Sequence, residues 1–163
     1  MTVRLPDGEN GAVLEAIRAA NEGDILVIDA KGNTNRAVAG DFVISLAKGI
    51  GVQGFVVDGV IRDIEAIREL NFPIFSLGTT VAAGNKNGGG QVNVPIAIGG
   101  VTVLPGDYII GDVDGVIVVP QQEAEKIVVA AEAKLEKDEK RAQEAHVNGK
   151  ESIIAYLDKV LAK

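Results

Sequence analysis

The sequence predicts an α/β fold with a mixed sheet and C-terminal helices. Three observations lead to this prediction. Short apolar runs alternate with segments of helical periodicity over residues 1–77, in the order βαβαβαβ. Residues 91–120 contain apolar runs separated by Gly, Pro and Asp turns, which predicts hairpins with little helix. Two charged segments with helical periodicity follow from residue 121.

The first half of the chain predicts four strands and three helices. Runs such as ILVID and GFVVD are typical of buried strands. Asn10 is a suitable N-cap for a first helix whose apolar face begins with Val13 and Ile17. Gly59 is expected to bend the chain where the third strand ends. We expect strands at residues 2–6, 25–29, 54–58 and 72–77, a polar loop at 31–35, and helices after residue 10, at about 34–47 and at 64–70.

The second half predicts strand pairs and then two helices. Turns at residues 99–100, 105–107 and 114–115 separate the expected strands. A charged helix begins near Gln121, and Asn148-Gly149 ends it. Ser152 is expected to cap a final amphipathic helix.

Composition limits the kinds of site that the chain can build. The chain has 163 residues, of which 47% are hydrophobic, so we expect one domain with a sizeable core. It has no Cys and a single histidine, His146, so it lacks thiolate chemistry and cannot form a multi-histidine site within one chain. Any metal would therefore be a hard ion held by oxygen, such as Mg²⁺ or Mn²⁺.

Charge and hydropathy limit the partners. The formal net charge is −7, which argues against nucleic acid as a partner because nucleic-acid binding needs a basic surface. No apolar run reaches the roughly 18 residues of a membrane span, and the start MTVRLPDGENG has no signal-peptide hydrophobic region. We therefore expect a cytoplasmic protein with neither a nucleic-acid nor a membrane partner.

Arg62 and Asp63 stand side by side where the strand GFVVD gives way to the helix IEAIREL. As structural residues, Asp63 would cap that helix and Arg62 would be a loop cation. As functional residues, Arg62 would bind a carboxylate in a fork and Asp63 would bind a hard cation such as Mg²⁺. A loop that joins a strand to a helix in an α/β sheet is a usual place for such a site.

The segment Gly40-Asp41-Phe42-Val43 is the second candidate. Gly40 interrupts a helical pattern, where it costs about 1 kcal/mol relative to Ala. A helix beginning there would direct free backbone N–H groups at an anion. Alternatively, Gly40 allows close packing and Asp41 is an N-cap. The pattern favours neither interpretation.

Other polar residues carry weaker signals. GNKNGGGQ (84–91) lacks the spacing of a phosphate loop, so we expect a flexible surface loop. Asp112 and Asp114 are expected to be turn residues. His146 is expected to be exposed at the polar end of a helix.

Asp41, twenty intervening residues and Arg62-Asp63 resemble the Asp-x20-Arg-Asp motif of the RraA-like family. That family includes 4-hydroxy-4-methyl-2-oxoglutarate/4-carboxy-4-hydroxy-2-oxoadipate aldolases and the regulator of ribonuclease activity A. The resemblance covers most of residues 1–120 through the segments GDILVIDAKGNTNRAVAGD, GVQGFVVDGVIRDIEAIRELNFPIFSLGTT and GGVTVLPGDYIIGDVDGVIVVP.

The resemblance implies a swivelling β/β/α-type fold in a single domain, residues 1–163, with a C-terminal helical extension at about 121–163. It also implies a homotrimer or a dimer of trimers. The aldolases of this family depend on a divalent metal, so Mg²⁺ or Mn²⁺ and a small oxo-acid substrate are expected here.

The resemblance also assigns roles to individual residues. Asp63 is implied to be the metal ligand and Arg62 the substrate-binding, catalytic arginine. Gly40, Asp41, Phe42 and Val43 are implied to form the loop whose backbone amides hold pyruvate, and Asp41 is a candidate to orient a catalytic water. Glu139 is the nearest candidate for an acidic residue that a neighbouring subunit contributes.

The expected function is therefore a carbon–carbon lyase: a class II aldolase that forms pyruvate, with an oxaloacetate decarboxylase side activity. The alternative is a non-catalytic regulator that binds ribonuclease E-type partners, because the family includes one. A methyltransferase is a poor third possibility, because no G-x-G-x-x-G segment follows a strand.

Overall fold

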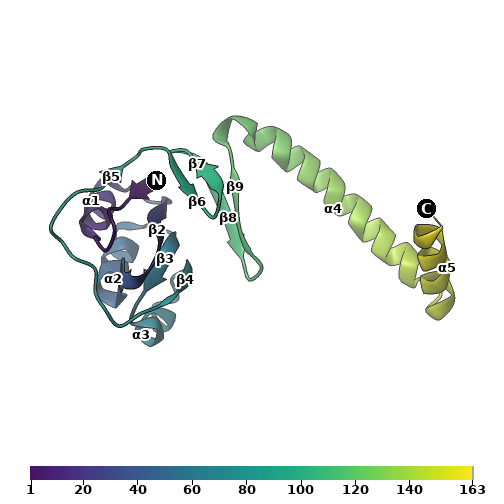
Figure 1. Cartoon of the computed structure of the whole chain (residues 1–163). Coiled ribbons are helices and arrows are strands. Elements are labelled where there is room, and N and C mark those ends of the chain that lie inside the picture. The colour runs from purple at the N-terminus through teal and green to yellow at the C-terminus, as the bar shows by residue number, and fades with distance from the viewer. Residues whose placement is uncertain (163) are drawn as a thin grey trace. The chain divides into compact units, whose positions relative to one another are not determined.

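The computed structural model describes residues 1–162, and the chain divides into two units at Gln121 and Gln122. The first unit contains the sheet and the hairpins, and the second contains the two C-terminal helices (Figure 1). The predicted α/β class, with a mixed sheet and C-terminal helices, is confirmed.

Five strands form the main sheet of the first unit, in the order β4-β3-β2-β1-β5. Strands β1 to β4 are parallel, and β5 runs antiparallel to β1, which makes the sheet mixed. The strands are β1 (Thr2–Arg4), β2 (Ile25–Ala37), β3 (Gly54–Ile61), β4 (Ile74–Thr79) and β5 (Gln91–Val92).

One face of this sheet packs against helices α1 (Gly11–Ala19), α2 (Asp41–Ile50) and α3 (Ile64–Glu69). The main core lies at this interface, where Ile28, Ile44 and Phe55 are fully buried. The ring of Phe55 meets that of Phe72 edge to face, with centroids 5.5 Å apart. Burying a side chain of this size contributes about 1.5–3 kcal/mol, so these contacts hold the helices on the sheet.

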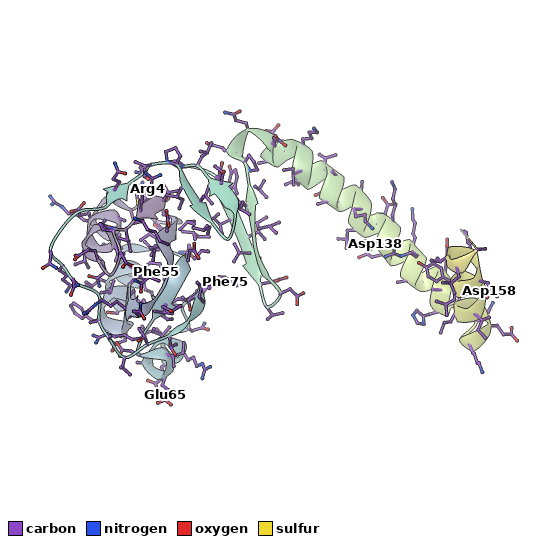
Figure 2. All side chains as sticks on the ribbon, viewed as in Figure 1. Arg4, Phe55, Glu65, Phe75, Asp138 and Asp158 are labelled. Atoms are coloured by element: carbon purple, nitrogen blue, oxygen red, sulfur yellow. The ribbon has the colours of Figure 1, made fainter. Side chains whose placement is uncertain are left out.

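The other face packs against two hairpins, β6 (Ile96–Ile98) with β7 (Val101–Val103) and β8 (Tyr108–Asp112) with β9 (Gly115–Val119). A second, smaller core joins Val27 and Val56 of the sheet to Ile96 and Val103 of the first hairpin. Phe75 extends toward the second hairpin (Figure 2), where a Cβ at Gly111 would lie only 2.7 Å from its ring. The strands therefore bury residues on both faces, as the continuous apolar runs predicted.

The second unit contains α4 (Ala124–His146) and α5 (Lys150–Leu161), preceded by a short 3₁₀ turn, η1 (Gln121–Glu123). Neither helix has a buried residue. Lys134 and Arg141 form ion pairs with Asp138 at 2.6 and 2.9 Å. The hydrogen bond from Lys134 is the main cause of a lowered pKa of the Asp138 carboxyl. Among the described residues, no helix is long and apolar enough to cross a membrane.

Two predicted capping roles are wrong. Asn10 takes the N-cap position of α1 but makes no side-chain capping bond. Its side-chain N–H donates to the backbone oxygen of Val38 at 3.2 Å, and its Oδ1, the atom that would accept a capping bond, is buried without a partner among the described residues. Ser152 lies inside α5, where its hydroxyl reaches the backbone oxygens of Ala145 (2.8 Å) and Gly149 (3.0 Å). Gly149, with a φ of 60°, occupies the N-cap position of α5 instead.

The largest correction concerns residues 31–40. The predicted loop at 31–35 belongs to β2, and the helix predicted from residue 34 begins only at Asp41. Register shifts on either side of Asn33 let β2 continue through this polar stretch. Asn33 also accepts backbone N–H groups from Asn35 (2.7 Å) and Arg36 (3.1 Å), so its side chain satisfies groups that the irregular ladder leaves free.

Gly59 also differs from expectation, because it lies inside β3 and does not end it. It pairs with Asn33 at the register shift, and a Cβ there would lie 2.8 Å from that of Ala30. Glycine at this position therefore lets the irregular part of β2 approach β3 closely.

Candidate active site

Two neighbouring strand-to-helix connections build the candidate site. The segment between β2 and α2 carries Gly40, and the segment between β3 and α3 carries Arg62 and Asp63. Because β2 and β3 are adjacent and parallel, both segments leave the sheet at the same edge. The backbone N–H of Arg62 donates to the oxygen of Ala39 at 3.1 Å, which holds the two connections together.

Gly40 is buried against the Arg62-Asp63 pair. A Cβ at Gly40 would lie 3.0 Å from Nε of Arg62 and closer still to Oδ2 of Asp63. Its backbone is extended, with φ −130° and ψ −174°, so glycine is required here for space and not for conformation. Close packing therefore accounts for a glycine at this position, and Gly40, not Asp41, takes the N-cap position. Because α2 begins there, the interpretation in which its free N–H groups face an anion stays a prediction.

Asp63 precedes α3 but makes no capping hydrogen bond. Its backbone is left-handed, with φ 61° and ψ 39°, a conformation that costs a non-glycine residue roughly 1 kcal/mol. Its Oδ2 lies 3.3 Å from Nε of Arg62, and both side chains remain partly exposed, at 35% and 43%. The carboxylate is therefore held at the surface beside a guanidinium, and it does not cap the N-terminus of α3.

A cavity of about 160 Å³ adjoins Arg62 and Gly40, whereas Asp63 is not among the residues that line it. Arg62 lines it together with the whole predicted loop, Gly40, Asp41, Phe42 and Val43. The first intrahelical bond of α2 runs from the N–H of Ile44 to the oxygen of Gly40, so the N–H groups of residues 41–43 have no backbone partner inside the helix. One of them, that of Phe42, donates to Oδ1 of Asp41 at 2.7 Å.

Six lining residues were not predicted as site residues: Asn10, Ala37, Ala39, Ala83, Gly84 and Lys86. Gly84 and Lys86 belong to the segment that we expected to be a flexible loop. The structure corrects that expectation for residues 84–87, because residues 82–87 are bound to the rest of the unit by hydrogen bonds. These include Ala37 N–H to Ala82 (2.8 Å), Gly84 N–H to Ala37 (2.9 Å), Asn10 N–H to Asn85 (2.8 Å) and Asn85 N–H to Gly8 (2.8 Å).

The remaining candidates lie outside this cavity. Asp112 accepts the backbone N–H of Asp114 at 2.9 Å in the β8–β9 turn, which confirms both as turn residues. His146 is exposed at the end of α4, as predicted. Glu139 lies on α4 in the second unit.

Asp41 in the cavity lining and Asp63 outside it suit a hard cation that keeps much of its water. Residues 1–162 contain no cluster of three or more His, Cys, Asp or Glu side chains able to hold a metal. Asp63 offers one carboxylate free of any capping bond, and Asp41 offers a second at the cavity. Mg²⁺ is typically held by one or two carboxylates, with waters or substrate filling its other positions, so these residues fit such an ion.

Comparison with known proteins places these residues in context. A family model described as "RraA-like: Aldolase/RraA" matches residues 1–118. A relative from Halalkalibacterium halodurans, provisionally named a 4-hydroxy-4-methyl-2-oxoglutarate aldolase, is 51% identical over 98% of this chain and 76% of its own length.

Two solved structures are also similar. The RNA-processing inhibitor RraA of a Thermus species has 33% identity and a TM-score of 0.68 over 74% of this chain and 73% of its own. An uncharacterized protein from Pseudomonas syringae has 28% identity and a TM-score of 0.82 over 95% of this chain and 73% of its own. Since the family model covers the sheet, the hairpins and both connections that build the cavity, the chain belongs to the RraA-like family.

Proposed function

We propose that the chain is a divalent-metal-dependent aldolase that cleaves 4-hydroxy-4-methyl-2-oxoglutarate or 4-carboxy-4-hydroxy-2-oxoadipate and releases pyruvate. One observation carries the proposal: Arg62 and Asp63 converge on Gly40 at the start of α2, beside a small cavity. The provisional name of the Halalkalibacterium relative supports the same reaction.

Arg62 and the start of α2 account for substrate binding. The guanidinium of Arg62 pairs with the oxo-acid and adds positive potential where negative charge develops. Backbone N–H groups in the first turn of α2, together with the positive end of the helix dipole, favour an anion in the same cavity. A cavity of about 160 Å³ is small beside the roughly 300–1,000 Å³ that drug-sized ligands occupy, so a small acid suits it.

Asp63 would hold Mg²⁺ or Mn²⁺, with Asp41 nearby. When bound, the cation supplies positive charge that stabilises the developing enolate. The bond between C3 and C4 of the substrate breaks, its electrons form the enolate of pyruvate, and the C4 hydroxyl becomes a carbonyl as it loses its proton. Asp41 orients the water that takes this proton. The enolate is then protonated at C3.

Loss of CO₂ from oxaloacetate leaves the same enolate, so we expect a decarboxylase side activity. The assay follows pyruvate released from each substrate with Mg²⁺ or Mn²⁺, before and after treatment with a chelator. Turnover should disappear with the chelator and return with the metal. A chain that turns over neither substrate under any divalent metal is not this aldolase.

A second candidate function is that of a non-catalytic regulator that binds a ribonuclease E-type partner. The similarity to the Thermus RNA-processing inhibitor favours it. The pyruvate-release assay distinguishes the two functions, because an aldolase turns over the substrates and a regulator that acts by contact need not.

The proposed assembly is a trimer or a pair of trimers, with Glu139 of a neighbouring copy as a candidate to complete the site. Tyr108, Ile110 and Ile117 are between 54% and 59% exposed on the β8–β9 hairpin, which supports burial between copies. Sedimentation at micromolar concentration should give a multiple of three. A stable monomer would contradict the assembly.

A further inference from the structure

Lys86 gives the cavity a second cation. Arg62 is the first, and its Nε is already paired with Asp63 at 3.3 Å. Within residues 1–162, Lys86 forms no ion pair and its side chain makes no hydrogen bond. The cavity lining therefore holds two cations and one carboxylate, that of Asp41.

The backbone on both sides of Lys86 is fixed. Asn85 donates to Gly8 and accepts from Asn10, both at 2.8 Å. Asn87 donates twice to the carboxylate of Glu9, from its backbone N–H at 2.9 Å and from its side-chain amide at 3.0 Å. Lys86 is itself exposed, and the bonds of its two neighbours hold its backbone beside the cavity.

The charges of the substrate explain why a second cation is useful. An oxo-acid such as pyruvate carries one carboxylate, which Arg62 can bind. The proposed aldolase substrates carry at least one more carboxylate, attached beyond the bond that breaks. Removing a second carboxylate from water without a partner is costly, so a cation opposite it stabilises the bound state.

We propose that Lys86 is a specificity-determining residue that binds this second carboxylate, so that the site prefers oxo-diacids to oxo-monoacids of equal chain length. The inference rests on the proposed function, which supplies the second carboxylate of the substrate and takes Arg62 as the partner of the first. The two cations in the cavity lining would then select the charge of the substrate.

The test compares 2-oxoglutarate with 2-oxopentanoate, which has the same chain length and one carboxylate fewer. Neither has a 4-hydroxyl group, so neither can undergo the aldol cleavage, and their binding can be measured by calorimetry with Mg²⁺ present. Wild type should bind 2-oxoglutarate at least about tenfold more tightly, the scale of one charged hydrogen bond in a partly exposed site.

Lys86→Met should remove this preference by weakening 2-oxoglutarate binding about tenfold while leaving 2-oxopentanoate unchanged. Lys86→Arg should retain most of it. Lys137→Met, which removes an exposed lysine of α4, is the matched control and should behave as wild type.

Equal affinity of wild type for the two acids, or an unchanged preference in Lys86→Met, would overturn the inference. Its failure is distinguishable from failure of the proposed function. If wild type cleaves the hydroxy-oxo-diacid but Lys86→Met keeps the preference, only the role of Lys86 fails. If wild type cleaves nothing but prefers 2-oxoglutarate, and Lys86→Met lacks this preference, the binding role of Lys86 stands and the aldolase function fails.

Discussion

Two parts of the cavity lining have different origins. Gly40–Val43 and Arg62 lie where regular strands meet regular helices, and we call them the regular wall. Gly84 and Lys86 lie in residues 82–87, the extended wall, which has only two isolated bridges, at Ala83 and Asn85. The regular wall offers the groups that suit chemistry, and the extended wall offers a cation that suits recognition. Substitutions in the two walls should therefore affect different steps.

The largest expected effect is that of Asp63→Asn. Asp63 follows Arg62, a residue of the regular wall, in the connection between β3 and α3. The substitution removes the anionic oxygen that a hard cation prefers, so turnover should fall about a hundredfold or more. The melting temperature should change little, because Asp63 makes no capping bond and Asn also tolerates a left-handed backbone. Pyruvate release and thermal melts check both points. An equally active variant would remove Asp63 from the proposed metal site.

Gly40→Ala should come next. The added Cβ would meet Oδ2 of Asp63 and Nε of Arg62, which are the ends of side chains and can move aside. We expect a small change in stability and a loss of up to about a hundredfold in kcat/KM, because displacing a reacting group by about 1 Å costs that much. Gly49→Ala, at a position with open space, is the matched control. Full activity of Gly40→Ala would show that the pair need not touch Gly40.

Arg62→Lys should have a smaller effect, a loss of at least about tenfold in kcat/KM. Lysine keeps the positive charge but cannot make the two-pronged contact of a guanidinium. Steady-state kinetics with the oxo-acid substrates measure the loss, and folding should be unaffected because the side chain is partly exposed. Unchanged kinetics would make Arg62 an ordinary loop cation.

The smallest expected effect is in the extended wall. Asn87→Ala removes the side-chain bond to Glu9, which helps to position Lys86, but keeps the lysine itself. The preference for 2-oxoglutarate over 2-oxopentanoate should fall about two- to fivefold, less than for Lys86→Met. Asn87→Asp should lower it further, because its carboxylate would face that of Glu9. If neither variant alters the preference, the bonds between Asn87 and Glu9 do not position Lys86.

The same contrast explains what the sequence could predict. The regular wall lies at the ends of apolar runs with clear periodicity, so Gly40–Val43 and Arg62-Asp63 could be found as candidates from pattern and resemblance. Residues 82–87 have no periodicity, and the bonds that fix them run to Gly8, Glu9 and Ala37, far away in sequence. No local pattern reports such bonds, so a fixed segment looked like a flexible loop.

The error at residues 31–40 has a related cause. Gly and Asn are disfavoured in strands by propensity, yet β2 continues through them. Pairing with β3 on one side and the side-chain bonds of Asn33 compensate for the irregular ladder. Gly59 was misassigned for the same reason, because the close approach of two strands cannot be inferred from either strand alone.

The left-handed backbone at Asp63 bears on how such a chain can change during evolution. This conformation accepts Asn and Gly as readily as Asp, so folding alone does not demand a carboxylate there. A single-codon replacement of Asp63 by Asn or Gly would then remove the proposed cation ligand while leaving the scaffold and its outer surfaces intact. A lineage could in this way exchange catalysis for recognition by contact in one mutational step, with little loss of stability to be repaired afterwards.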